Sequence, residues 1–161
     1  MNIVFLQLGS NIENRVLFLK NANKIIKRKV GAILDQSKIY ESTPWGVSNQ
    51  NNYLNQIIKV TTKLSANMLL HTIMDIEKRL GRVRAEKWGA RSIDIDIIFY
   101  NDSIINTSKL SIPHKFMHER MFVLLPLNKI APNMKHPIYN KTIQELISEC
   151  KDSELVKEYA I

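Results

Sequence analysis

Up to residue 99, the apolar positions of the chain switch repeatedly between strand-like and helix-like spacing. Short apolar or β-branched runs predict strands, and apolar residues three and four positions apart predict amphipathic helices. The pattern predicts, in chain order, a strand at 2–8, a helix at 13–29, strands at 33–41 and 53–62, a helix at 66–80 and a strand at 93–99. Gly31 and Gly81 are placed to end the two helices, and Ser65 is placed to cap the second.

The order β-α-β-β-α-β is typical of ferredoxin-like folds. Beyond it, residues 101–114 predict a short hairpin or loop, and residues 118–127 an apolar helix. Thr142 and Glu145 have the spacing of a capping box and so begin a last helix. We therefore expect an α+β fold, with a ferredoxin-like core and additional C-terminal helices. Since no repeat or linker interrupts the chain, residues 1–161 are expected to form a single domain.

Composition narrows the class of protein. The chain has 161 residues, of which 45% are hydrophobic, enough for one compact domain with its own core. No apolar run approaches the roughly 20 residues that a membrane helix needs, and residues 1–11 lack the basic and small-residue features of a signal peptide. Cys150 is the single cysteine, so no internal disulfide can form, and a cytoplasmic location is expected. A buried hydrophobic role suits Cys150 better than a nucleophilic one.

The formal net charge of +8 suggests an anionic partner, such as nucleic acid, acidic lipid or a polyphosphate. Singly scattered lysines on a solvated surface account for much of the excess. One cluster of basic residues stands out between residues 79 and 91, in a loop expected at 82–92 that contains two glycines. Arginine, which dominates this cluster, suits bidentate phosphate recognition. Its members are Arg79, Arg82, Arg84, Lys87 and Arg91.

Two carboxylates directly follow this basic loop. In a strand at 93–99, Asp94 and Asp96 point to one face, because side chains alternate along a strand. Salt bridges to nearby arginines or an edge strand facing water would explain them. A divalent metal would explain them equally, since Mg²⁺ commonly binds one or two carboxylates together with substrate phosphates. The adjacent arginine loop favours the metal, and no glycine-rich phosphate loop of the Walker type is present.

Other side chains suit recognition of a flat heterocycle. Tyr53 and Asn55 lie two residues apart on a predicted strand and therefore share a face. An aromatic ring can stack on a heterocycle while an amide reads its edge. Phe122 lies in the late apolar helix, where a core role is the simpler interpretation. His114, in a loop after a proline, is placed to donate to phosphate if one binds nearby.

Taken together, these segments resemble the 6-hydroxymethyl-7,8-dihydropterin pyrophosphokinase family over almost the whole chain. The matching segments keep the family's order and spacing. They are LGSN at 8–11, YESTP at 40–44, YLN at 53–55, EKRLGRVRAEKWGARSIDID at 77–96, IPH at 112–114 and RMFVLLP at 120–126.

The resemblance implies that the β,γ-diphosphate of ATP passes to the hydroxymethyl oxygen of a reduced pterin, with release of AMP, a step of folate synthesis. It implies two magnesium ions held by Asp94 and Asp96. Tyr53 and Phe122 then resemble the residues that sandwich the pterin, and Asn55 with Thr43 and Pro44 those that read its edge. The residues that resemble the family's nucleotide contacts are Glu77, Arg84, Trp88, Arg91, Ile97, Ser111, His114 and Arg120. Arg82 and Arg91 resemble the arginines of a closing loop that act in catalysis.

The chain departs from the family pattern in the arginine loop and after the histidine. Ala90 stands where the family usually has proline, which removes a fixed φ angle from the loop. Lys115 stands where an aromatic residue often follows the histidine, and Trp45 lies in a loop that is often richer in proline. These departures bear on loop closure and on one nucleotide contact.

Two other functions fit parts of the pattern. An RNA-binding module would share the element order and the positive charge, but the strand at 93–99 lacks the basic and aromatic pattern of such modules. A nucleotidyltransferase using Gly9, Ser10 and the aspartate pair would leave a nucleotide on its acceptor and release pyrophosphate. For the pyrophosphokinase we expect ATP and a reduced pterin as partners, no nucleic acid, no membrane and a monomer.

Overall fold

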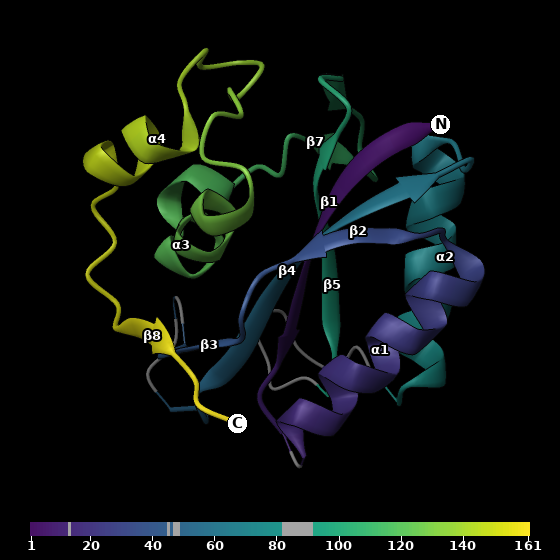
Figure 1. Cartoon of the computed structure of the whole chain (residues 1–161), viewed down its shortest axis with the longest axis horizontal. Coiled ribbons are helices and arrows are strands. Elements are labelled where there is room, and N and C mark those ends of the chain that lie inside the picture. The colour runs from purple at the N-terminus through teal and green to yellow at the C-terminus, as the bar shows by residue number, and fades with distance from the viewer. Residues whose placement is uncertain (13, 45, 47–48, 82–91) are drawn as a thin grey trace.

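The computed structural model describes the chain except residues 13, 45, 47–48 and 82–91. Figure 1 labels most of its helices and strands. They are β1 (Asn2–Ser10), α1 (Arg15–Lys29), β2 (Ile33–Gln36), β3 (Tyr40–Ser42), β4 (Tyr53–Thr62), α2 (Ala66–Arg79), β5 (Asp94–Tyr100), β6 (Ile105–Asn106), β7 (Ser111–Ile112), the 3₁₀ turn η1 (Met117–Glu119), α3 (Met121–Ile130), α4 (Ile143–Glu149) and β8 (Val156–Glu158).

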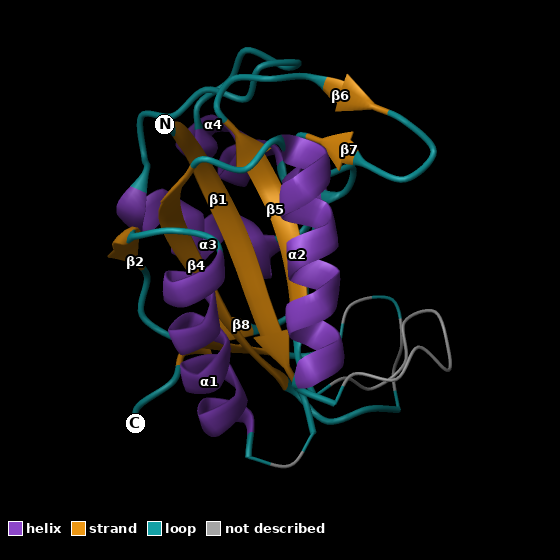
Figure 2. Ribbon diagram, turned by 90° about the vertical axis from the view of Figure 1, so that its right-hand side faces the viewer, coloured by secondary structure: helices purple, strands orange, loops and turns teal. Residues whose placement is uncertain are grey.

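One antiparallel sheet forms the centre of the molecule, with the strand order β5-β1-β4-β3-β8 and with β2 also paired to β4. Helices α1 and α2 lie on one side of this sheet (Figure 2), and α3 and α4 lie on the other (Figure 1). When β2 and β3 are taken as two pieces of one strand, the order is that of a ferredoxin-like fold. The predicted α+β fold with a ferredoxin-like core and additional C-terminal helices is confirmed.

Two hydrophobic cores follow from the alternation of side chains along the strands. Leu6 and Leu8 of β1 and Ile95 of β5 pack with α1 and α2. Phe5 of β1 and Phe99 of β5 lie in the opposite core, with α3 and α4, and their rings meet edge to face at a centroid distance of 6.1 Å. Each strand therefore presents one set of side chains to each pair of helices, and both cores hold the central strands in place.

Several predicted boundaries are confirmed. Helix α1 begins two residues later than predicted, after Asn14, whose side chain accepts from the Leu17 N–H, and it ends at Lys29 as predicted, before Gly31. A Cβ atom at Gly31 would lie 1.8 Å from the Thr61 carbonyl oxygen, so only glycine fits there. The capping box of Thr142 is present at the start of α4, and β6 and β7 form the hairpin expected within 101–114.

The single strand predicted at 33–41 is wrong, because the structure divides it into β2 and β3. The break lies at Ser37, whose hydroxyl accepts from the Ile57 N–H at 3.0 Å. The Ser37 carbonyl accepts from the side chain of Gln56 at 3.0 Å. Side-chain hydrogen bonds thus replace part of the strand ladder and bend the chain between the two pieces.

The predicted helix at 118–127 also differs from the structure. A 3₁₀ turn over Met117–Glu119 precedes α3, which runs over Met121–Ile130 and includes Pro126. Strand β8 was not predicted and extends the sheet beyond β3. Cys150 is partly buried and packs against the core of α3 and α4, as its hydrophobic character suggests.

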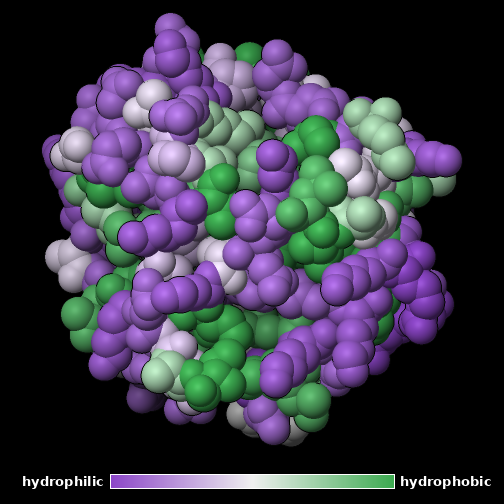
Figure 3. All heavy atoms as spheres, in the orientation of Figure 1, coloured by the Kyte–Doolittle hydropathy of each residue, from purple (hydrophilic) through white to green (hydrophobic). Residues whose placement is uncertain are grey.

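Hydrophilic side chains cover most of the face shown in Figure 3, and apolar groups appear there in separate patches. Among the residues that the structure describes, no helix is both long enough and apolar enough to cross a membrane.

Candidate active site

The two aspartates lie at the start of β5, which is the edge strand next to β1. Asp94 and Asp96 are partly exposed on one face, whereas Ile95 between them is 4% exposed and packs in the core of α1 and α2. The predicted alternation is therefore present. It places both carboxylates on the face of the sheet that α3 and α4 cover near the other end of β5. Across the strand pair, Asp94 lies opposite Gly9 and Asp96 opposite Gln7.

A buried carboxylate fixes the backbone between these aspartates. Glu77, on α2, is 3% exposed, and its Oε1 accepts from the Ile95 N–H at 2.8 Å. Ser92 also ties the chain before β5 to α2, because its hydroxyl donates to the Leu80 carbonyl at 3.2 Å. The helix thus sets the position of the strand that carries the aspartate pair.

Gly9 has no side chain and lies on the sheet between the aspartates and Asn55. It pairs with Asp94 on one side and with Asn55 on the other, so the three positions form a row across the same face. A Cβ atom at Gly9 would lie 3.5 Å from the ring of Tyr53 and 3.6 Å from Asn55 Oδ1. The ring and the amide therefore border a spot where no side chain projects.

The amide of Asn55 is held in one orientation. Its Oδ1 accepts from Gln7 Nε2 at 3.1 Å, and its Nδ2 donates to Ser42 Oγ at 2.8 Å. Asn55 is 1% exposed and Gln7 is 4% exposed. Because these partners lie on the two strands beside β4, the amide is fixed before any ligand binds.

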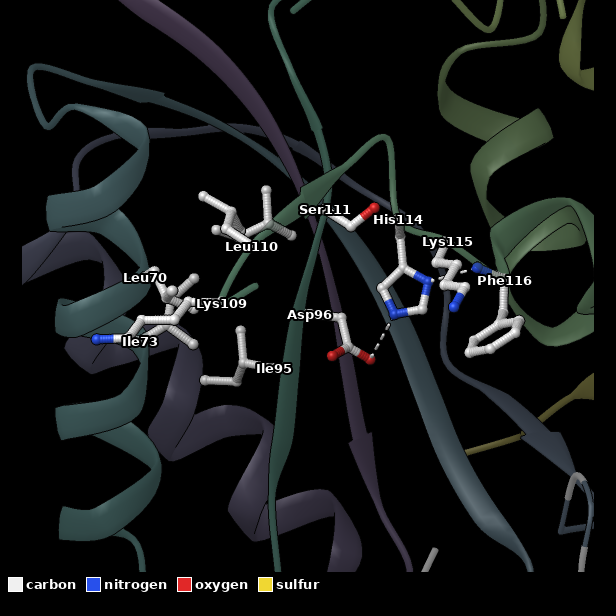
Figure 4. A pocket seen from close by; sticks show the side chains of 11 residues that line it. Leu70, Ile73, Ile95, Asp96, Lys109, Leu110, Ser111, His114, Lys115 and Phe116 are labelled. Atoms are coloured by element: carbon white, nitrogen blue, oxygen red, sulfur yellow. Dashed lines mark hydrogen bonds and ion pairs between the residues drawn. The ribbon is translucent and has the colours of Figure 1, made fainter. Parts of the chain in front are cut away.

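His114 faces Asp96 from the loop after β7, at a distance of 3.9 Å between Nε2 and Oδ2 (Figure 4). Its Nδ1 accepts from the Phe116 N–H at 3.1 Å, so we assign the ring proton to Nε2. Burial lowers the pKa of His114 to about 4, Arg120 acts in the same direction, and Asp94 opposes both. The ring is therefore neutral at pH 7 and presents one N–H towards the aspartate.

A pocket of about 230 Å³ surrounds this pair at the sheet edge (Figure 4). Helix α2 supplies apolar walls, and the β6–β7 hairpin and the following loop supply polar groups. The lining side chains are Leu70, Ile73, Ile95, Asp96, Ile97, Lys109, Leu110, Ser111, His114, Lys115 and Phe116.

Arg120 links this pocket to α3. Its side chain is almost fully buried, at 7% exposure for the residue, and its guanidinium carbon lies 5.3 Å from the ring centroid of Phe116 and 5.7 Å from that of Phe122. Burial lowers the pKa of Arg120, and the charges of Asp96 and Asp94 oppose that effect. The guanidinium therefore stays charged and provides positive charge next to the aspartate pair.

The structure brings together most of the residues that the sequence singled out. Around the aspartates lie Glu77, Ile97, Ser111, His114 and Arg120. Tyr53 and Asn55 border Gly9, and Thr43 and Pro44 directly follow β3, beside them. Phe122 stands on α3 next to Arg120. Arg82, Arg84, Trp88 and Arg91 lie outside the described residues, as do Ala90 and Trp45.

Three further residues of the site were missed from the sequence. Gln7 and Ser42 orient Asn55, although Ser42 lies within a segment that matches the family. Phe116 lies against His114, with ring centroids 6.3 Å apart, and against Arg120. The aromatic ring expected directly after the histidine is thus supplied one residue later. Alternation along β1 puts Gln7 on the same face as Gly9. Its contact with Asn55 on β4 depends on how the strands pair, which the sequence does not give.

The aspartate pair suits a hard divalent cation. Two partly exposed carboxylates share a sheet face, and both supply the oxygen ligands that Mg²⁺ prefers. Within the described part of the chain, no group of three or more His, Cys, Asp or Glu side chains is placed to hold a metal. A cation held by the described residues would therefore take two protein carboxylates and leave other positions to water and phosphate, a common arrangement for Mg²⁺.

Comparison with known proteins gives a consistent result. Residues 5–132 match the family model described as 7,8-dihydro-6-hydroxymethylpterin-pyrophosphokinase (HPPK). The chain is 42% identical over 149 residues to the 2-amino-4-hydroxy-6-hydroxymethyldihydropteridine pyrophosphokinase of Aquifex aeolicus, covering 92% of each chain. It is 37% identical over 158 residues to the enzyme of the same name from Haemophilus influenzae, covering 98% of each.

Solved structures share the fold. The crystal structure of Plasmodium falciparum HPPK-DHPS superposes with a TM-score of 0.73 at 22% identity, over 92% of this chain. An HPPK-DHPS structure in complex with substrates gives a TM-score of 0.74 at 18% identity. This chain spans 43% of the length of each of these two solved chains.

Proposed function

The chain belongs to the 7,8-dihydro-6-hydroxymethylpterin-pyrophosphokinase family, and from that premise we propose how its own residues carry out the reaction. The enzyme transfers a pyrophosphoryl group from ATP to hydroxymethyldihydropterin in folate synthesis. The observation that carries our assignment of roles is the position of Asp94 and Asp96. They lie between the His114 pocket on one side and the row of Gly9 and Asn55 on the other.

ATP binds along the edge of β5. Ile97, Ser111 and His114 line the pocket there, and Glu77 on α2 fixes β5 through its hydrogen bond to the Ile95 N–H. Arg120 offsets phosphate charge, and neutral His114 donates its Nε2–H to a phosphate oxygen. Arg82, Arg84, Trp88 and Arg91, assigned from the sequence alone, complete the nucleotide contacts, with Arg82 and Arg91 acting on the transferred group.

The pterin lies over Gly9. Tyr53 and Phe122 stack on its two faces; the Tyr53 ring borders Gly9, and Phe122 stands on α3 beside Arg120. Asn55, held by Gln7 and Ser42, reads the edge of the heterocycle together with the backbone at Thr43 and Pro44. A fixed amide loses little freedom on binding, so it favours a ligand with matching donors and acceptors.

Asp94 and Asp96 would hold Mg²⁺, and we expect two ions. When bound, the metal would neutralise phosphate charge and lower the pKa of the substrate hydroxyl. In the transfer, the hydroxymethyl oxygen forms a bond to the β-phosphorus, and the bond from that phosphorus to the α-phosphate oxygen breaks. The hydroxyl proton passes to a carboxylate oxygen of the pair, and AMP leaves. The side chains around the pair act mainly by alignment and by charge.

The test of the metal assignment is conservative substitution of each aspartate. Asp94→Asn and Asp96→Asn each remove one charge and keep the shape, so turnover at saturating Mg²⁺ should fall by at least about 100-fold. Asp102→Asn, at an exposed position just after β5, is the matched control and should leave turnover unchanged. Turnover near the wild-type value in either site variant would remove that aspartate from the metal site.

We further propose that residues 1–161 act as a single domain, as a monomer in the cytoplasm, and without a nucleic acid partner. The continuous sheet supports the single domain, because β1 and β8 both belong to it. Analytical ultracentrifugation of the full chain tests the monomer, and a sedimenting dimer would contradict it.

A further inference from the structure

The C-terminal segment, residues 150–159, lies beyond the residues that match the family model, which end at 132. It leaves α4 after Glu149, passes the start of α3 and enters the sheet as β8 beside β3 (Figure 1). The segment therefore touches two elements that border the proposed pterin site.

The first contact is at the start of α3. Asp152 Oδ2 accepts from the Met121 N–H at 2.9 Å, and the residue at the start of this helix, Arg120, makes no side-chain cap of its own. Met121 lies between Arg120 and Phe122. The carboxylate of Asp152 also favours the charged form of Arg120 against burial. Asp152 thus supplies, from 31 residues away in sequence, the cap that fixes the first turn of the helix carrying Phe122.

The second contact is at the end of β3. The Glu154 carboxylate accepts a hydrogen bond from the Thr43 hydroxyl, and the Leu155 carbonyl accepts from the Thr43 N–H at 3.2 Å. Next to it, Ser42 pairs with Val156 in the β3–β8 ladder. Ser42 is also the residue that orients the amide of Asn55. This end of the segment therefore holds the strand that brings Thr43 and Asn55 to the site.

The two contacts are joined to each other. Asp152 Oδ1 accepts from the Glu154 N–H at 2.9 Å, while its other oxygen accepts from Met121. One carboxylate thus connects the start of α3 to the stretch that holds Thr43. A change at either residue shifts one wall of the pterin site relative to the other.

We propose that Asp152 and Glu154 are positioning residues for the pterin, with Asp152 fixing the Phe122 side and Glu154 the Thr43 side. This proposal rests on the pterin placement given above. The nucleotide pocket lies at the opposite edge of the sheet, on β5, and receives no contact from either carboxylate among the described residues. Loss of Glu154 therefore acts on pterin binding and spares ATP binding, whereas Asp152 also favours the charged form of Arg120, a proposed phosphate contact.

Asp152→Asn and Glu154→Ala test the proposal in the full-length protein. An asparagine at 152 has an NH₂ group in place of one carboxylate oxygen, so one of the two N–H groups that the carboxylate serves would face a donor. We expect the Kd of hydroxymethyldihydropterin, measured by calorimetry with a non-hydrolysable ATP analogue present, to rise about tenfold in each variant. The KM for pterin should rise likewise in both variants, and in Glu154→Ala the Kd of the ATP analogue alone should stay within about twofold.

Two variants serve as controls. Glu154→Gln keeps an acceptor for the Thr43 hydroxyl and should restore most of the pterin affinity. Glu158→Ala removes a carboxylate from the same segment, where it faces Lys38 at 3.5 Å on the exposed side, and should change neither Kd. If the substitutions only reduce general stability, the melting temperature falls but pterin affinity does not fall more than ATP affinity. That result would overturn the proposal.

The failure of this inference can be told from a failure of the pterin placement. Tyr53→Ala tests the placement alone, because Tyr53 is assigned direct contact with the pterin. If Tyr53→Ala weakens pterin binding and both C-terminal variants bind normally, the positioning role is wrong and the site stands. If Tyr53→Ala also binds pterin normally, the placement is wrong and the positioning role falls with it. If Asp152→Asn does not fold, Glu154→Ala and its glutamine counterpart decide the outcome.

Discussion

Glu77 offers the sharpest test of how the metal-binding strand is held. Its buried carboxylate accepts from the N–H of Ile95, the residue between the two aspartates. Glu77→Ala leaves that N–H buried without its acceptor, which costs about 1–3 kcal/mol. The lost γ-methylene adds about 0.8 kcal/mol. Glu77→Gln keeps an acceptor oxygen at the same place and should cost less than about 1 kcal/mol.

Urea unfolding of the two variants gives the stability, and steady-state turnover gives the effect on the site. We expect Glu77→Ala to lose about 2–4 kcal/mol of unfolding free energy, a large part of the 5–15 kcal/mol typical of a domain. Its turnover should fall at least about tenfold under conditions where it stays folded, because β5 carries both metal ligands.

The paired variants also separate acceptor from charge. If Glu77→Gln is as unstable as Glu77→Ala, the charge of the carboxylate matters and the acceptor role described here is wrong. If Glu77→Ala is as stable as the wild type, the contact does not hold the strand. A normal stability of Glu77→Gln with weakened ATP binding would instead support the nucleotide contact that the sequence suggests.

Three other predictions concern the pterin site and the response to pH. Gly9→Ala should fold with stability within about 1 kcal/mol of the wild type, since its Cβ meets only ordinary contacts. Gly9→Val should crowd Tyr53 and Asn55 and weaken pterin binding in calorimetry without changing ATP affinity. Phe122→Ala should weaken pterin binding more than ATP binding, by about 0.5–1.5 kcal/mol beyond the lost buried area, and an unchanged pterin Kd would remove it from the site. Burial lowers the pKa of His136 to about 4, so this residue contributes stability that is complete above pH 6.5 and is lost as the pH falls towards 4, by up to about 3 kcal/mol. His136→Asn keeps an acceptor for the Ile138 N–H but does not titrate. The unfolding free energy from urea should therefore depend less on pH in this variant than in the wild type. Equal pH dependence in the two proteins would contradict the role given to His136.

Local patterns predicted much of the fold and the central part of the site. Alternation along a strand was enough to place Asp94 and Asp96 on one face, and Tyr53 and Asn55 on one face, because that rule needs only neighbouring residues. Helix spacing and glycine stops gave α1 and α2 to within two residues at each end. These features depend on sequence separations that a short window covers.

The features that were missed depend on partners far along the chain. Strand β8 is three residues long, with no buried position and no apolar alternation, and it is a strand only because β3 pairs with it. The break at Ser37 arises from contacts with β4, 20 residues away. Thr43 and Glu154 are separated by 111 residues. No local pattern encodes such contacts, so the second layer of the pterin site became visible only in the structure.

The most direct test of the account is the identity of the products. ATP, Mg²⁺ and hydroxymethyldihydropterin are incubated with the full-length enzyme, and nucleotides and pterins are followed together by ³¹P NMR and chromatography. We predict AMP and a pterin that carries a diphosphate, formed in equal amounts and in step with each other. ADP with a singly phosphorylated pterin, or pyrophosphate with a nucleotide attached to the acceptor, would contradict attack at the β-phosphorus and with it the arrangement proposed here.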